Sequence, residues 1–155
     1  MSITTAMLPA DGRDNSRLVD ITPDRVFKRT EKGFRFSLIF KRRLWEASFK
    51  RCAYCGDEIK GHGASHVDHV LPRSEGGSES IDNLACACAF CNSSKGAGSL
   101  ADLRFKVALY KSPVGGIVTP SQALALIEAG TILPIDYVRP FYFECVAREG
   151  GGYVR

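Results

Sequence analysis

The sequence predicts an α+β fold in which a small, metal-stapled core is flanked by helices, and three observations support this. Two Cys-x-x-Cys pairs, Cys52/Cys55 and Cys88/Cys91, are separated by 32 residues, a spacing that can bring four sulfur ligands together. The segment 52–98, which contains both pairs, holds seven Gly and so favours short elements joined by tight turns. Apolar residues recur at helical spacing on both sides of this segment.

The composition is that of an ordinary globular chain. Of the 155 residues, 45% are hydrophobic and 25% are charged, which excludes wholesale disorder and a coiled coil. No stretch approaches the roughly 18 apolar residues of a membrane span. Residues 1–10 lack the basic n-region of a signal peptide, so we expect a cytoplasmic protein without a membrane partner.

A basic helix is predicted immediately before the first cysteine pair. Ser37 is a suitable N-cap, and we expect a helix over 37–50. Four apolar residues follow its helical spacing: Phe36, Phe40, Leu44 and Ala47. The apolar residues of 34–40 also alternate, which would instead favour a strand.

Two helices and a strand are predicted after the second cysteine pair. Ser99 can cap a helix with apolar residues at Leu100, Leu103, Val107 and Tyr110. The segment 119–122 has capping-box spacing with Pro at the first helical position, and Gly130 is suited to end that helix. Alternating apolar residues over 141–145 favour a late strand.

The domain organisation follows from these elements. We expect a flexible N-terminal arm over 1–24 and a single domain over 25–155, with its motif core at 52–98 and a mobile tail at 150–155. Residues 1–36 and 100–155 contain no motif that indicates their role.

Positive charge is concentrated before the motif core. Residues 25–51 carry ten Lys or Arg against two Glu, whereas residues 52–99 carry three basic and six acidic residues. This pattern is typical of a nucleic-acid-binding protein, although a solvated helix face produces it too. On the predicted helix, Lys41, Arg42 and Arg43 are the candidate nucleic-acid contacts.

The cysteines indicate metal binding rather than disulfides, because the chain has no predicted secretion signal. Four thiolates around one Zn²⁺ make a closed structural site without a position for substrate. A thioredoxin-like redox pair is the competing interpretation, but the second pair and the missing βαβ pattern argue against it. Cys86 and Cys145 remain, and Cys86 is either a buried free thiol or an alternative ligand two residues before Cys88.

Between and around the cysteines lies a longer motif. The pattern CxxC, DHxxPxSxGG, NLxxxCxxCNxxKG is met at every fixed position from Cys52 to Gly96. In this motif the chain resembles the HNH endonucleases of the His-Me finger (ββα-metal) superfamily, in the subgroup with a four-cysteine zinc knuckle. The resemblance covers about 45 of the 155 residues and implies a small ββα-metal, treble-clef-like core.

The resemblance also implies an active site. Asp68 and Asn92 would hold one Mg²⁺ or Mn²⁺, for which carboxylate and amide oxygens are suitable ligands. His69 would be the general base that activates water. Asn83 would hold the hairpin loop and orient that base. The family's products carry 5′-phosphate and 3′-hydroxyl ends.

Three nearby residues are further candidates. His66 would share a strand face with Asp68, either as a third metal ligand or substrate contact or as a plain exposed histidine. Lys95 lies three residues past Asn92 on the same helical face and is expected to contact phosphate. Arg73 is either a second phosphate contact or a solvated arginine.

The sequence therefore predicts a metal-dependent HNH endonuclease that acts on DNA, with RNA as the alternative nucleic acid. The alternative functions are a non-catalytic, treble-clef-type zinc module that binds DNA or RNA, and a protein-interaction zinc domain. The intact trio of Asp68, His69 and Asn92 favours the enzyme, because binding alone does not require it. One site cuts one strand at a time, so double-strand cleavage would need a dimer or two encounters.

Overall fold

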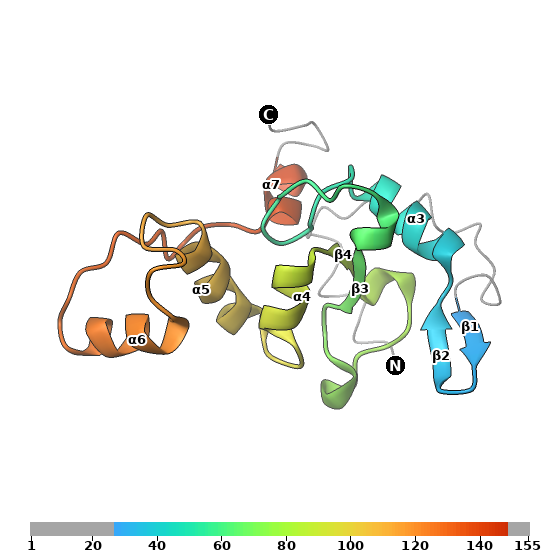
Figure 1. Ribbon diagram of the computed structural model, residues 1–155, viewed down its shortest axis with the longest axis horizontal. Coiled ribbons are helices and arrows are strands. Elements are labelled where there is room, and N and C mark those ends of the chain that lie inside the picture. The colour runs from blue at the N-terminus through green and yellow to red at the C-terminus, as the bar shows by residue number, and fades with distance from the viewer. Residues whose placement is uncertain (1–26, 149–155) are drawn as a thin grey trace.

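The computed structural model describes residues 27–148, whose elements are arranged along one long axis (Figure 1). A small β-hairpin lies at one end, helix α6 at the other, and a ββα unit between them. The arm expected over 1–24 and the tail expected over 150–155 lie outside the described residues.

The hairpin is a feature that the sequence analysis does not predict. Strands β1 (Phe27–Thr30) and β2 (Gly33–Phe36) pair antiparallel, with Phe27 opposite Phe36. The alternation seen over 34–40 therefore belongs to a strand only as far as Phe36, where the helical pattern takes over.

Helix α3 (Leu38–Ala47) is the predicted basic helix. Ser37 accepts a hydrogen bond from Phe40 N at 3.1 Å, as an N-cap does. The helix ends before residue 50 because Phe49 and Lys50 have φ angles of 55° and 61°, in the left-handed region. Its buried residues are Phe40, Leu44 and Ala47.

The central ββα unit consists of β3 (His66–His69), β4 (Leu84–Ala87) and α4 (Ala89–Lys95). The two strands pair antiparallel, with Asp68 opposite Ala85. Short 3-10 turns lie before and between the strands, at His62–Ala64, Arg73–Glu75 and Ile81–Asn83. All four residues of β4 are buried, so this strand runs through the core. The predicted α+β class with flanking helices is confirmed.

Two C-terminal helices begin at their predicted caps. Ser99 caps α5 (Leu100–Tyr110), and a capping box at Thr119 begins α6 (Pro120–Glu128). Gly130, with a φ of 87°, follows the end of α6 as expected of a C′ glycine.

The strand predicted over 141–145 is wrong, because the chain forms helix α7 (Tyr142–Arg148) there. The N–H of Phe141 donates to the side chain three residues later at 2.8 Å, as at a helix N-terminus. Phe141 precedes the helix and Phe143 lies in its first turn, and both buried rings contact Tyr54. The alternation of Phe141 and Phe143 therefore reflects their shared contact with Tyr54 and not a β-strand.

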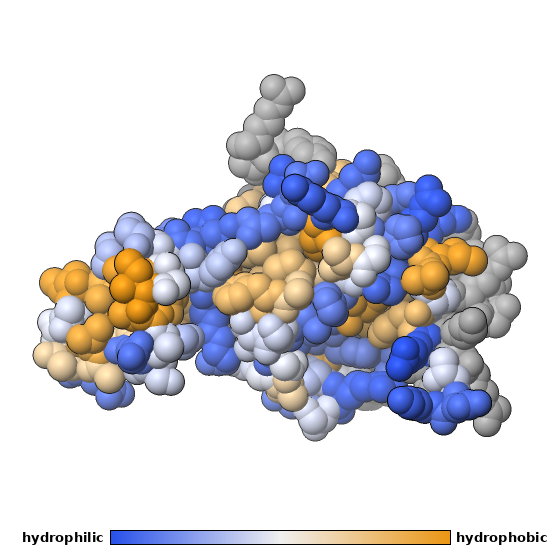
Figure 2. Space-filling model, in the orientation of Figure 1, coloured by the Kyte–Doolittle hydropathy of each residue, from blue (hydrophilic) through white to orange (hydrophobic). Residues whose placement is uncertain are grey.

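Two apolar clusters hold these elements together. The larger joins α3, β4, α5 and the start of α7, and its largest fully buried side chains are Tyr54, Phe40 and Phe141. The smaller joins α5 and α6 through Ala108, Leu109, Ala123 and Ile135. Figure 2 shows apolar surface at the α6 end. The exposed large apolar residues of the described part of the chain include Ile117, Leu124, Ile132 and Val138. Within 27–148, no helix is long and apolar enough to cross a membrane.

Candidate active site and zinc centre

The four cysteine sulfurs of the two pairs form one cluster, in which all lie within 4.8 Å of one another. The Sγ atoms of Cys55 and Cys88 are 3.8 Å apart. Tetrahedral Zn²⁺ with Zn–S bonds of about 2.3 Å separates its sulfur ligands by about 3.8 Å. The donor set and the spacing therefore fit a structural zinc ion. Among the residues that the structure describes, no other group of three or more His, Cys, Asp or Glu is placed in this way.

Local structure brings the two pairs together. Gly56 has a φ of 80° and donates its N–H to Cys52 O at 3.0 Å, which closes the first knuckle. Cys88 is the N-cap of α4, and its Sγ accepts a hydrogen bond from Cys91 N at 3.4 Å. Ala53 N donates to a carbonyl of β4 at 2.8 Å, so the first knuckle is tied to the central sheet.

The thiols change one another's ionisation. Hydrogen bonds from Cys52, Cys55 and Cys91 lower the pKa of Cys88, whereas contacts with Cys52, Cys55 and Cys88 raise the pKa of Cys91. The same sulfur contacts lower the pKa of Cys52 and raise that of Cys55, so the four thiols are mutually coupled, and a bound cation would stabilise them as thiolates. Cys86 is outside the cluster, and burial raises its pKa to about 12, so it is a buried thiol rather than a zinc ligand.

Asp68 lies within β3, is 6% exposed, and is contacted by two side chains. Tyr54 Oη, which comes from between the first two cysteines, donates to Asp68 Oδ2. Lys95 Nζ, at the end of α4, lies 3.1 Å from Oδ2 and 3.3 Å from Oδ1, and also donates to His69 O at 2.7 Å. A buried carboxylate is costly unless it is paired and hydrogen-bonded, and these two residues meet that requirement.

Lys95 differs from its expected role as a phosphate contact. Its side chain is 0% exposed, and the ammonium points inward to Asp68. Helical spacing correctly places Lys95 near Asn92. The lysine nevertheless points inward, because the buried carboxylate of Asp68 would be costly without a cation beside it. The Lys95 side chain therefore lies inside the site and not on its solvent-exposed face.

Asn83 holds the loop that joins the two strands. Its side chain is 1% exposed in total, accepts from Leu71 N at 2.8 Å, and donates to Leu71 O at 3.0 Å and to Ser78 O at 2.9 Å. Asn83 directly precedes β4, so these three bonds connect the last residue of the loop to its beginning at Leu71 and to Ser78 within it. This geometry is consistent with the expected role of Asn83 in tying down the loop.

His69, at the end of β3, is held by two neighbours. Its Nε2 lies 3.0 Å from Glu79 Oε2, and its ring centroid lies 5.9 Å from that of Phe36. The second carboxylate oxygen of Glu79 forms an ion pair with Arg73 Nε. Arg73, 68% exposed, is therefore neither simply solvated nor committed to phosphate in this structure.

His66 and Asn92 meet beside this group. Asn92 Nδ2 lies 3.5 Å from His66 Nδ1, which brings β3 and α4 together and leaves the amide oxygen of Asn92 available. A carboxylate has about four lone-pair positions, and three contacts from Tyr54 and Lys95 engage Asp68. The oxygen donors of Asp68 and Asn92 are of the type that a hard divalent ion takes, whereas the imidazole of His66 would supply a softer nitrogen donor.

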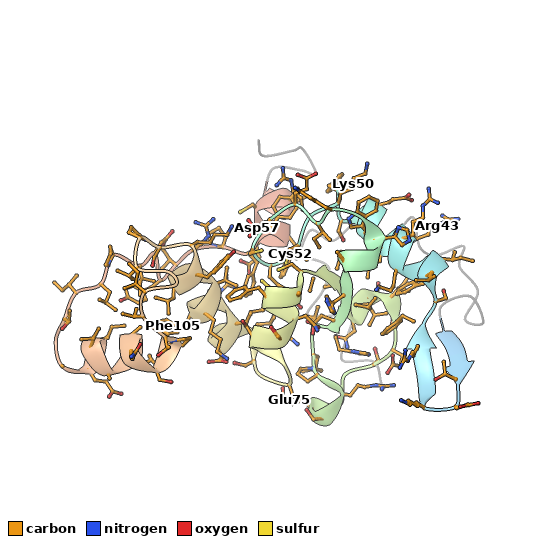
Figure 3. All side chains as sticks on the ribbon, in the orientation of Figure 1. Arg43, Lys50, Cys52, Asp57, Glu75 and Phe105 are labelled. Atoms are coloured by element: carbon orange, nitrogen blue, oxygen red, sulfur yellow. The ribbon has the colours of Figure 1, made fainter. Side chains whose placement is uncertain are left out.

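The basic face of α3 lies at the hairpin end of the molecule, where Figure 3 labels Arg43. Arg42 and Arg43 are exposed and Lys41 is half-buried, and Arg42 pairs with Glu46 at 3.0 Å. Strand β2 also lies beside the site, because Phe36 contacts the His69 ring.

Sequence reasoning missed two residues that touch the site. Tyr54 occupies a variable position of the first Cys-x-x-Cys pair. Its aromatic side chain between two metal ligands is the only feature of the sequence that could have indicated a role in the site. Glu79 lies in a loop with Glu75 and Asp82, and nothing in the sequence distinguishes these three acidic residues.

Comparisons with known proteins agree with this geometry. Residues 52–98 match the family model described as HNH endonuclease. A segment of 47 residues is 43% identical to the CRISPR-associated endonuclease Cas9 of Corynebacterium diphtheriae. That segment is 30% of this chain but only 4% of the relative's length, so the similarity is confined to the motif core. No solved structure matches the chain significantly.

The fold and the site together define a ββα unit with a four-cysteine cluster suited to zinc. The segment that forms this unit, residues 52–98, is the part of the chain that matches the HNH endonuclease family model.

Proposed function

We propose that this chain is a metal-dependent endonuclease that hydrolyses phosphodiester bonds of DNA. The observation that supports the proposal is the contact of strand β3 with helix α4, the two elements that carry the HNH residues. Asp68 and His69 come from β3 and Asn92 from α4, and the contact between His66 and Asn92 brings these elements together. The match to the HNH endonuclease family supports the same reaction class.

In this proposal, His69 takes a proton from water, and the resulting hydroxide attacks phosphorus. Asp68 and Asn92, with His66 as a further ligand, would hold Mg²⁺ or Mn²⁺. When bound, the ion would stabilise negative charge on the phosphate and on the leaving 3′ oxygen. The resemblance to HNH nucleases supports products with 5′-phosphate and 3′-hydroxyl ends. Lys41, Arg42 and Arg43 would contribute to the affinity for DNA through its phosphates.

A second function is favoured by one observation. Asp68 is already paired with Lys95, as it would be in a non-catalytic zinc module that keeps the fold and binds DNA or RNA. The two functions differ in whether His69 and Asp68 are needed for cleavage or only for folding.

The test compares His69→Ala and Asp68→Asn with His62→Ala in plasmid relaxation, with and without Mg²⁺ or Mn²⁺. Asparagine is chosen at position 68 because it keeps a side-chain oxygen that can accept from the buried Lys95, whereas alanine would leave this ammonium with only His69 O as an acceptor. His62 is the matched control, since its ring faces Trp45 at 6.2 Å and contacts no proposed ligand.

His69→Ala should lose cleavage by about 10² to 10⁴ while DNA binding persists. Asp68→Asn should also lose cleavage, with partial recovery at raised Mn²⁺, whereas added metal should not help His69→Ala. His62→Ala should cleave like the wild type. Cleavage by His69→Ala at the wild-type rate, or no cleavage by any preparation, would refute the enzyme and favour the binding module.

A further inference from the structure

Glu79 is not a fixed position of the HNH motif, but it contacts the histidine of that motif directly. Glu79 Oε2 is 3.0 Å from His69 Nε2, and the side chains are 33% and 17% exposed, respectively. The other oxygen, Oε1, pairs with Arg73 Nε. One carboxylate oxygen thus contacts the proposed base, and the other lies in an ion pair with a guanidinium without a hydrogen bond to it.

The loop that carries Glu79 is built to hold it there. Asn83 Nδ2 donates to the carbonyl of Ser78, the residue before Glu79, at 2.9 Å. At Gly77 the loop passes so close to the segment that follows β3 that a Cβ would lie 1.8 Å from Leu71 O. Gly77 N also donates to Pro72 O at 2.9 Å, which closes the turn. The position of Glu79 is thus set by a packed turn and a buried asparagine.

This contact determines the tautomer of a neutral His69 ring. A carboxylate only accepts hydrogen bonds, so His69 Nε2 must carry the hydrogen when it bonds to Glu79. A neutral imidazole has one N–H, and therefore Nδ1 of the same ring is the free acceptor.

We infer that Glu79 is a positioning residue that fixes the tautomer and orientation of His69, so that Nδ1 is the atom that accepts the proton. Glu79 touches neither substrate nor metal in this role and acts only through the histidine. Phe36, at 5.9 Å between ring centroids, further restricts the ring. Arg73 holds the second carboxylate oxygen and limits rotation of Glu79. The inference rests on the proposed function, because it takes His69 as the general base.

The first test is spectroscopic and does not depend on cleavage. The full chain with its zinc is labelled with ¹⁵N-histidine, and the tautomer of His69 is determined by NMR at about pH 8.5, where a free imidazole is neutral. The chain has three histidines, so His62→Ala and His66→Ala assign the signals. We expect the Nε2–H tautomer in the wild type and a mixture of tautomers in Glu79→Ala.

Glu75→Gln is the matched control. Glu75 is exposed in the same loop, and Figure 3 shows it at the loop tip, away from the strands. This variant should keep the wild-type tautomer. An Nδ1–H tautomer in the wild type, or the same tautomer in Glu79→Ala as in the wild type, would overturn the inference.

The second test separates positioning from substrate binding. Glu79→Ala should lower kcat about 10- to 100-fold with KM within about twofold, because a misplaced base slows chemistry rather than binding. Glu79→Gln retains an acceptor oxygen and should recover most of the loss. A wild-type kcat in Glu79→Ala, or Glu79→Gln no better than Glu79→Ala, would count against the role. If the wild type cleaves no DNA, the proposed function fails, while the tautomer experiment still decides the contact.

Discussion

Replacement of Asn83 by alanine should weaken the fold and the site together. The Asn83 side chain makes three hydrogen bonds in a nearly fully buried position, two with Leu71 and one with Ser78. A typical net contribution of about 1 kcal/mol per bond gives about 3 kcal/mol. Partners that reach water in the variant would reduce this loss, and partners that stay buried and unpaired would increase it. We therefore expect a loss of about 2–4 kcal/mol.

The measurement is the free energy of unfolding in urea, with zinc present throughout. Asn92→Ala is a control with the same side-chain chemistry, because Asn92 is only half-buried and its side chain has a single contact at 3.5 Å with His66. Asn92→Ala should change stability by less than about 0.5 kcal/mol but should lose metal-dependent cleavage. Equal stabilities for Asn83→Ala and Asn92→Ala would refute the assignment of Asn83 as the loop anchor.

Two further predictions concern zinc and DNA affinity. Purified protein should contain about one Zn²⁺ per chain, and Cys52→Ser should misfold, because structural zinc supplies on the order of 10 kcal/mol. Cys145→Ser, outside the cluster, should be mild, and zinc-free folded protein in metal analysis would contradict the prediction. Replacing Lys41, Arg42 and Arg43 with glutamine should weaken DNA binding and flatten its salt dependence. Each lost phosphate contact should change the log–log slope by about 0.9, as measured by fluorescence anisotropy, and an unchanged slope would assign these residues to solvated surface.

The parts of the fold that sequence predicts are those with local signals. The zinc cluster follows from ligand spacing, and the starts of α3, α5 and α6 follow from cap residues that act within one turn. The hairpin at 27–36 escapes prediction because its β2 strand runs directly into the apolar spacing of α3. The 141–145 segment misleads because its alternating rings pack on one residue that is distant in sequence.

The same distinction applies to the site. The sequence motif names Asp68, His69 and Asn92, but it does not show what surrounds them. Helical spacing predicts which side of the helix carries Lys95, but it does not predict that this side chain is buried. Glu79 was not expected because its contact with His69 depends on the path of a whole loop.

The contacts of Asp68 explain why a zinc ion that touches no substrate matters to this site. Tyr54 lies between the two cysteines of the first pair, and Lys95 lies four residues after the last cysteine. Both therefore reach Asp68 from segments whose positions the zinc cluster fixes. The rings of Phe141 and Phe143 also pack on the Tyr54 ring, with centroids 5.3 and 6.1 Å away. Loss of zinc would remove the constraint on both partners of the buried carboxylate at once, so the structural metal and the proposed catalytic centre form one cooperative unit.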